Sequence, residues 1–161
     1  MCVYFTVVMA ILTILIGMIT SYIAYAQMNI ARAKVKLDLY ERRFNVYVVA
    51  LNCYQELYKQ QPQQIAKRTY DVIQSCRESK FLFKEEDGID KILDKMKENS
   101  DQVCKYEDYV SKNGRIHSDD PQTAQELLKK ATDAKKDFEA KLYDLEVKIK
   151  PYIQFQNVKG C

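Results

Sequence analysis

The sequence predicts an all-α protein in which an N-terminal transmembrane helix is continuous with a long helix and leads into a helical bundle. Residues 3–26 contain no charged side chain, and the 161-residue chain has only four glycines and three prolines, the residues that most disfavour helices. Beyond residue 26, apolar residues recur at steps of three and four, which places them on one helical face. We therefore expect a transmembrane helix over residues 1–26 and a cytoplasmic helical bundle over residues 27–161.

The apolar segment is long enough to cross a membrane. About 20 apolar residues span the hydrocarbon of a bilayer, and residues 3–26 exceed that length. Tyr4 near one end, with Tyr22 and Tyr25 near the other, suits the two membrane interfaces. A cleaved signal peptide is the alternative, because residues 24–26 (AYA) resemble a cleavage site. No Lys or Arg precedes the apolar run, and the run exceeds the usual apolar region of a signal peptide, so we favour a retained anchor.

Basic residues follow the apolar segment and determine its predicted orientation. They are Arg32, Lys34, Lys36, Arg42 and Arg43. The positive-inside rule places the side of the membrane richer in Lys and Arg in the cytoplasm, so we expect the C-terminal body there. The simplest role of these residues is contact with anionic headgroups, at about 1 kcal/mol each. Ion pairs on the helix surface with Asp38 and Glu41, or a position at the mouth of an assembly, are alternatives.

Small residues in the apolar segment are regularly spaced. We call this set the small-residue stripe: Thr6, Ala10, Thr13, Gly17, Thr20 and Ala24, at steps of 4, 3, 4, 3 and 4. Small side chains let helices approach closely in lipid, so the stripe predicts contact with neighbouring copies or a central lumen. A plain anchor, with the spacing due to chance, is the alternative.

One long helix and three shorter ones are predicted. The first covers residues 3–60, because no Gly or Pro lies between Gly17 and Pro62. Its predicted packing face beyond the membrane has heptad spacing: Ile30, Ala33, Leu37, Tyr40, Phe44, Tyr47, Leu51, Tyr54 and Tyr58. The other helices are predicted over residues 63–79, 89–112 and 121–149, with a turn at 85–88, capping residues at 118–120 and Pro151 as the stop.

The same spacing predicts which residues of the later helices face the core. They are Ile65, Tyr70, Ile73 and Cys76; Ile92, Leu93, Met96, Val103, Tyr106 and Val110; and Ala124, Leu127, Ala131, Ala134, Phe138, Leu142, Leu145 and Ile149. Residues 81–83 (FLF) are predicted to plug the core, and Tyr152, Ile153 and Phe155 to dock as a tail on the bundle.

Few residues of the chain suit catalysis or metal binding. The five cysteines lie far apart with no CxxC pair, which argues against a disulfide framework or a zinc site. The single histidine, His117, lacks partners for a His-based metal site or a Ser-His-Asp arrangement. The net charge of +3 is too mild to indicate nucleic-acid binding. We therefore expect reduced thiols, no metal, no cofactor and no enzymatic activity.

A degenerate nuclease-like motif is one further interpretation. Small helical ribonucleases of the HEPN class use an Arg followed a few residues later by a His. Here Lys112 precedes His117, and a lysine lacks the planar, bidentate fork of an arginine. A surface histidine is the simpler interpretation.

Three stretches resemble a family of small bacterial membrane proteins. Residues 36–47 (KLDLYERRFNVY) resemble the signature LDLYDRRFxVY of that family. Residues 79–83 (SKFLF) and 89–93 (IDKIL) resemble its RFLF…YLDEL stretch, and the tail over 151–155 (PYIQF) also fits. The resemblance covers most of residues 30–155.

By architecture, the chain is most similar to the small membrane accessory proteins of RNA-targeting type VI-B CRISPR systems. That resemblance implies an oligomeric pore in the bacterial inner membrane that aids antiviral defence and is linked functionally to an RNA-guided effector. Lys112 and His117 would then be relics of a nuclease motif. Our leading hypothesis is a ring-like homo-oligomer in the lipid bilayer that acts as a pore or permeabilising effector. A membrane-anchored scaffold that tethers a cytoplasmic partner is the main alternative, and a degenerate HEPN-like ribonuclease is the third.

Overall fold

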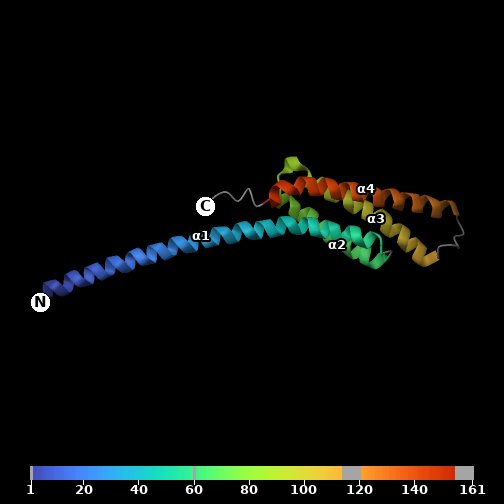
Figure 1. Ribbon diagram of the computed structural model, residues 1–161. Coiled ribbons are helices and arrows are strands. Elements are labelled where there is room, and N and C mark those ends of the chain that lie inside the picture. The colour runs from blue at the N-terminus through green and yellow to red at the C-terminus, as the bar shows by residue number, and fades with distance from the viewer. Residues whose placement is uncertain (1, 60, 114–120, 155–161) are drawn as a thin grey trace. The chain divides into compact units, whose positions relative to one another are not determined.

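The computed structural model describes residues 2–59, 61–113 and 121–154, and every regular element in these ranges is helical. The elements are α1 (Cys2–Leu57), α2 (Pro62–Leu82), the 3-10 helix η1 (Glu85–Asp87), α3 (Ile89–Asn113) and α4 (Pro121–Ile153) (Figure 1). The predicted all-α fold class is confirmed, and so is each predicted helix. The predicted cap at residues 118–120 lies outside the described residues.

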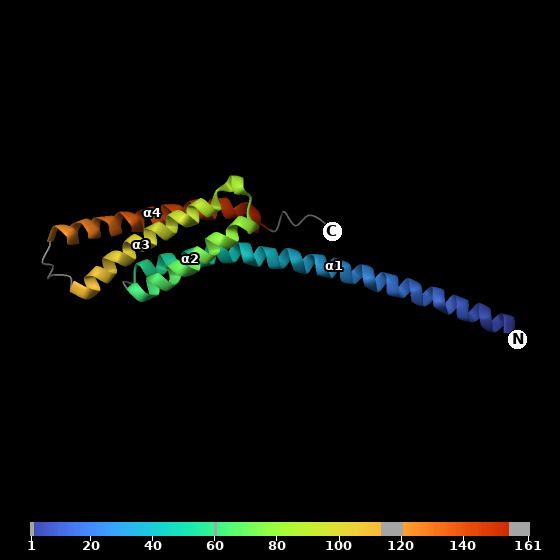
Figure 2. The ribbon, with the colours of Figure 1, turned by 180° about the vertical axis from the view of Figure 1, so that it is seen from behind.

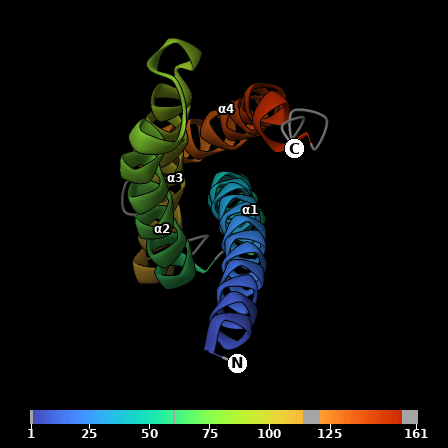
Figure 3. The same ribbon diagram turned by 90° about the vertical axis from the view of Figure 1, so that its left-hand side faces the viewer.

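The chain divides into two compact units, Met1–Leu39 and Tyr40–Cys161. The first unit holds the N-terminal part of α1, and every side chain from Tyr4 to Tyr25 is exposed. The second unit holds the rest of α1 with α2, η1, α3 and α4, and it has its own hydrophobic core. In this unit α3 packs directly against both α2 and α4 (Figures 2 and 3).

The predicted core residues of α4 agree best with the buried residues of the structure. Six of its eight predicted core residues are buried: Ala131, Ala134, Phe138, Leu142, Leu145 and Ile149. The fully buried Phe138 stacks on Tyr54 of α1, with ring centroids 6.0 Å apart. The helix continues to Ile153, so Pro151 lies inside its last turn and is not the predicted stop. Tyr152 and Ile153 are half-buried against the unit, which explains why the turn persists past a proline.

Helix α1 buries a different row of residues from the predicted one. Its buried positions in the second unit are Val46, Ala50, Cys53 and Leu57. The predicted residues Tyr47, Leu51 and Tyr54 are half-buried beside the core, and Tyr58 is exposed beyond the end of the helix. Small residues such as Ala50 let helices pack closely, whereas each tyrosine keeps a hydroxyl that needs water or a partner. The prediction failed because the buried row has the same three-four spacing, so the spacing alone does not distinguish the two rows.

Two predictions about aromatic residues of α2 are wrong. Tyr70 is exposed, and Phe81, which was predicted to plug the core, is 90% exposed. The helix extends to Leu82, and its buried face includes Thr69 and Ser79. Their hydroxyls donate to the carbonyl oxygens of residues 65 and 76 at 2.9 and 2.8 Å. Thr69 and Ser79 can be buried because their hydroxyl groups are hydrogen-bonded within their own helix. The face with these two residues points inward, and the aromatic side chains therefore point outward.

We expect Phe138→Ala to lower the free energy of unfolding by about 3–5 kcal/mol, because it leaves a cavity in a fully buried site. The matched control is Phe81→Ala, which removes the same side chain from an exposed position and should change the value by less than about 0.5 kcal/mol. Urea unfolding of the detergent-purified protein, followed by far-UV circular dichroism, measures both. Equal losses would contradict the buried and exposed assignments.

Candidate functional site

The first candidate site is the exposed apolar segment of α1. Among the described residues, α1 is the helix that is long and apolar enough to cross a membrane. Its most apolar stretch has no side chain buried by the rest of the chain. Large apolar residues such as Ile14, Ile16 and Met18 are about as exposed as Ile11 and Ile19 elsewhere around the helix. A helix that is apolar on all sides needs an apolar surrounding, which the described part of this chain does not provide.

The hydroxyls in this segment donate to their own helix. Thr13 Oγ1 donates to the Met9 carbonyl at 2.8 Å, and Ser21 Oγ donates to the Gly17 carbonyl at 2.8 Å. Thr20 Oγ1 lies 3.0 Å from the carbonyls of both residue 16 and Gly17. These bonds satisfy the donors without water, so the segment is compatible with lipid. They also leave the small-residue stripe only weakly polar.

Gly17 forms the narrowest point of the small-residue stripe. A side-chain carbon placed on Gly17 would meet no atom of its own chain within 4 Å. Any intolerance of a larger residue at this position would therefore come from a neighbouring molecule. A substitution at Gly17 therefore tests whether copies associate through this face.

The basic residues after the apolar segment fall into two groups. Arg32, Lys34, Lys36 and Arg42 are exposed, as contact with headgroups would require. Arg43 is instead half-buried in the second unit. Sequence spacing does not separate Arg43 from its neighbour Arg42, because both follow the same apolar segment.

Arg43 is the centre of a group of contacts that we call the Arg43 cluster: Arg43, Leu82, Phe83, Asp87 and Tyr152. Its Nε donates to the Leu82 carbonyl at 2.9 Å. The guanidinium carbon lies 4.8 Å from the ring centre of Tyr152 and 6.0 Å from that of Phe83. The two rings meet edge to face with centroids 5.2 Å apart. A planar cation between two aromatic rings is stabilised by their negative faces.

Tyr152 joins the cluster through its hydroxyl as well as its ring. The hydroxyl donates a short hydrogen bond to the Asp87 carboxylate and accepts a longer one, 3.5 Å, from the backbone N–H of Lys84. Burial, followed by the hydrogen bond to Asp87, raises the pKa of Tyr152. The protonated phenol is thus the favoured donor. These contacts join α1, the α2–α3 connection and the last turn of α4, so the cluster organises the fold and carries no evident reactive group.

The thiols of the described cysteines are not reactive nucleophiles. Cys53 and Cys76 are buried, Cys104 is half-buried, and all three are free. Burial raises the pKa of Cys53 to about 11, against a small opposing effect of a hydrogen bond with Ser100. Burial, with Asp94 nearby, also raises the pKa of Cys76 to about 11. Because the thiolate is the reactive form, both side chains are expected to act as packing residues.

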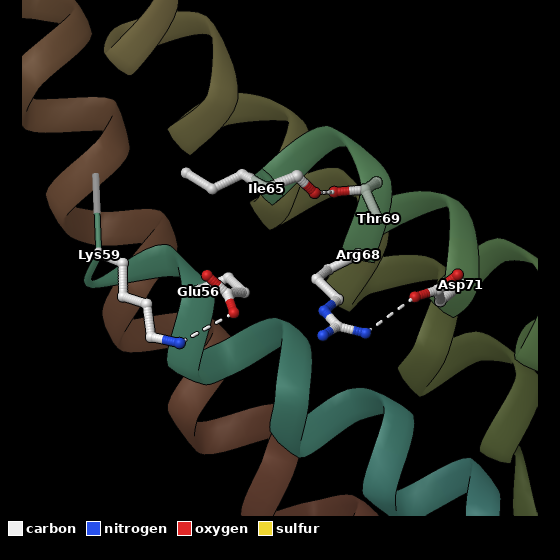
Figure 4. A network of polar contacts seen from close by, with 6 residues as sticks. All are labelled: Glu56, Lys59, Ile65, Arg68, Thr69 and Asp71. Carbon is white, nitrogen blue, oxygen red and sulfur yellow. Dashed lines mark hydrogen bonds and ion pairs between the residues drawn. The ribbon is translucent and has the colours of Figure 1, made fainter. Parts of the chain in front are cut away.

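The polar contacts where α1 leads into α2 are local. Lys59 pairs with Glu56 at 3.0 Å, and Arg68 pairs with Asp71 at 3.4 Å (Figure 4). Each pair is three residues apart in sequence, and such local pairs add only a few tenths of a kcal/mol, about 0.2–0.5 each. This group stabilises the connection and has no arrangement suited to chemistry.

The degenerate nuclease-like motif is only half described. Lys112 is exposed, and its Nζ pairs with the Asp108 carboxylate at 2.7 Å. His117 lies outside the described residues, so the structure does not test the pairing of the two. The described Lys112 is a surface residue in a local ion pair.

One buried carboxylate was not singled out from the sequence. Glu107 on α3 is 4% exposed, and its Oε1 lies 3.5 Å from Lys135 Nζ on α4, an ion pair without a hydrogen bond. Lys135 also lies 5.6 Å above the Tyr58 ring. A glutamate this enclosed cannot be reached by a substrate, so we assign the pair to packing of α3 against α4. The heptad rule missed Glu107 because it selects apolar residues alone.

A small hollow lies beside the Arg43 cluster. It holds about 280 Å³, and its polar lining includes Lys80 and Lys84 opposed by Glu85 and Asp90. The charges balance, so the hollow favours neither an anion nor a cation. Within the described ranges, no group of three or more His, Cys, Asp or Glu side chains is placed to hold a metal ion.

The chain matches no protein-family model, no curated protein and no solved structure.

We expect Arg43→Lys to lower the free energy of unfolding by about 1–2 kcal/mol, because lysine keeps the charge but loses the planar donor to Leu82. The matched control, Arg42→Lys, should change it by less than about 0.5 kcal/mol. Both variants preserve net charge, so attraction to anionic lipid stays the same. Urea unfolding in detergent measures the difference, and equal effects would argue against a distinct role for Arg43.

Proposed function

We propose that the protein is a single-span protein of the bacterial inner membrane, with α1 crossing the bilayer and the second unit in the cytoplasm. The observation that carries this proposal is the charge-free, fully exposed stretch from Tyr4 to Tyr25, which the chain itself leaves uncovered. The exposed basic residues Arg32, Lys34 and Lys36 follow it and favour the cytoplasmic orientation of the body.

We further propose that copies associate through the small-residue stripe and permeabilise the membrane as a pore or pore-like effector. The supporting observations are the regular spacing of small side chains and the open surface at Gly17. In lipid, close approach of backbones replaces the hydrophobic effect as the source of helix association. A weakly polar stripe of this kind would gate by wetting and dewetting instead of by charge.

The second candidate function is a membrane-anchored scaffold. The hydroxyl bonds of Thr13 and Thr20 to their own helix favour it, since a stripe with satisfied donors packs as readily against another helix as against water. In this case copies would still associate, but no conducting path would form. Leakage measurements separate the two functions.

The link to antiviral defence rests on the resemblance in architecture to the membrane accessory proteins of type VI-B CRISPR systems, which is one N-terminal span followed by a compact helical body. Under this proposal the chain would act beside an RNA-guided effector and would have no catalytic role of its own. The degenerate HEPN-like ribonuclease remains the third function, and it depends on Lys112 and His117.

Topology gives the first test. A green fluorescent protein fused after Cys161 should be fluorescent in cells, and an alkaline phosphatase fused there should be inactive, because the body is expected in the cytoplasm. Mass spectrometry should find the apolar segment retained in membranes. Active phosphatase, or a mature chain that begins at Gln27, would overturn the anchor.

Association gives the second test. Gly17→Ile should give a smaller oligomer in detergent and lower dye leakage from expressing cells by about ten-fold or more, because a branched side chain would separate backbones that need to touch. Within one copy, a Cβ at this position has open space beyond its own helix backbone. The control is Leu15→Ile, on the opposite side of the helix, which should leave both measurements unchanged.

The two measurements distinguish the proposed functions. Loss of oligomers together with leakage supports the pore. If the wild type forms oligomers but causes no leakage, the scaffold replaces the pore. If Gly17→Ile reaches the membrane and preserves both oligomers and leakage, the small-residue stripe is not an interface.

A further inference from the structure

A second apolar face lies on α1 beyond the apolar segment. We call it the juxtamembrane seam: Ile30, Ala33, Leu37, Tyr40 and Phe44, spaced 3, 4, 3 and 4. Ile30, Leu37 and Phe44 are 65%, 50% and 40% exposed. Tyr40 is half-buried and stacks on Phe44, with centroids 6.3 Å apart. The described residues thus leave two heptads of apolar spacing largely uncovered.

We propose that the juxtamembrane seam is an interface with a second copy of this chain, in a parallel coiled coil. The inference rests on the proposed membrane span, because a shared orientation in the bilayer makes neighbouring α1 helices parallel. Two heptads are short for an independent coiled coil. Anchoring in one membrane raises the effective concentration of the partner helix, which compensates for the short length.

The charges beside the seam favour this partner. With Ile30 and Leu37 at a positions, Lys36 occupies a g position and Glu41 the next e position. In a parallel coiled coil, a g residue faces the e residue five positions later on the neighbouring helix. Lys36 of each copy therefore faces Glu41 of the other, which places opposite charges together twice. Lys34, also at an e position, faces the neutral Asn29 and adds no repulsion.

The end of the seam is also fixed by the fold. Beyond Phe44 the same heptad spacing reaches Tyr47, Leu51 and Tyr54, which already pack against the core of their own unit. Arg43 occupies the next g position but is bonded to the Leu82 carbonyl of its own chain. The interface is thereby limited to residues 30–44.

The seam is independent of the small-residue stripe. Leu37 is rotated about 200° from Gly17 at about 100° per residue, and about 260° at the 3.5 residues per turn of a coiled coil, so the two faces point in different directions about α1. A copy bound through the seam is therefore not the copy bound through the stripe. This separation allows the two interfaces to be tested apart.

Disulfide cross-linking in native membrane vesicles tests the seam. With Cys2 and Cys161 changed to serine, Leu37→Cys is compared with Val35→Cys. Val35 is exposed and apolar as well, but it occupies an f position on the far side. Two cysteines join only when their Cα atoms lie within about 7 Å, so the Leu37 variant should form a covalent dimer at least about ten-fold faster under mild oxidation. Equal rates would overturn the proposal.

A charge exchange provides a second measurement. Lys36→Glu or Glu41→Lys alone should reduce cross-linking at position 37 several-fold, because each places like charges together. The double variant should restore it. Residues five apart on one helix do not face each other, so rescue reports a contact between copies. Unchanged cross-linking in all three variants, or no rescue, would argue against the seam.

The outcomes also distinguish the seam from the proposed function. If the protein is found in the soluble fraction, the membrane span fails. If it is in the membrane and positions 35 and 37 cross-link equally, the seam alone fails. Cross-linking at position 37 that survives Gly17→Ile supports the seam as an interface separate from the stripe.

Discussion

The Arg43 guanidinium joins three segments that are far apart in the sequence. It contacts the Leu82 carbonyl and the rings of Phe83 and Tyr152. Each of the three stretches that resemble the bacterial membrane family, residues 36–47, 79–83 and 151–155, contributes to this contact. A lysine could not replace Arg43 here, because the contact needs a directed donor and a flat cation together. The Arg43 cluster is therefore a packing contact, and its residues indicate a fold more directly than an activity.

The same three-four spacing on α1 has different physical meanings along its length. Near Ala50 and Cys53 it reflects packing against the other helices of the chain. Near Gly17 no residue of the chain covers the helix. Periodicity shows that a helix has an apolar face, but it does not identify which residues or molecules cover that face. For this reason the sequence predicted the long helix correctly and misjudged which of its residues lie in the core.

The predictions succeeded where apolar size alone decided burial. The face of α4 around Phe138 was predicted because every buried residue on it is apolar. They failed where a polar group was satisfied locally: Thr69 and Ser79 are buried, and Phe81 is exposed instead. The role of Arg43 was missed for a related reason, since its partners lie about 40 and 110 residues away along the chain, beyond any local pattern. Long-range polar contacts were the part that sequence spacing could not provide.

A protein without a catalytic centre acts through its surfaces. Among the described helices, α1 has two apolar faces that the other described residues leave largely uncovered. The small-residue stripe and the proposed juxtamembrane seam point in different directions about the helix axis, so a copy that used both would have two different neighbours. Two unlike faces on each copy allow it to contact two neighbours through different surfaces, which extends an assembly beyond a pair. A larger assembly is what a pore requires and what a scaffold with a single partner does not.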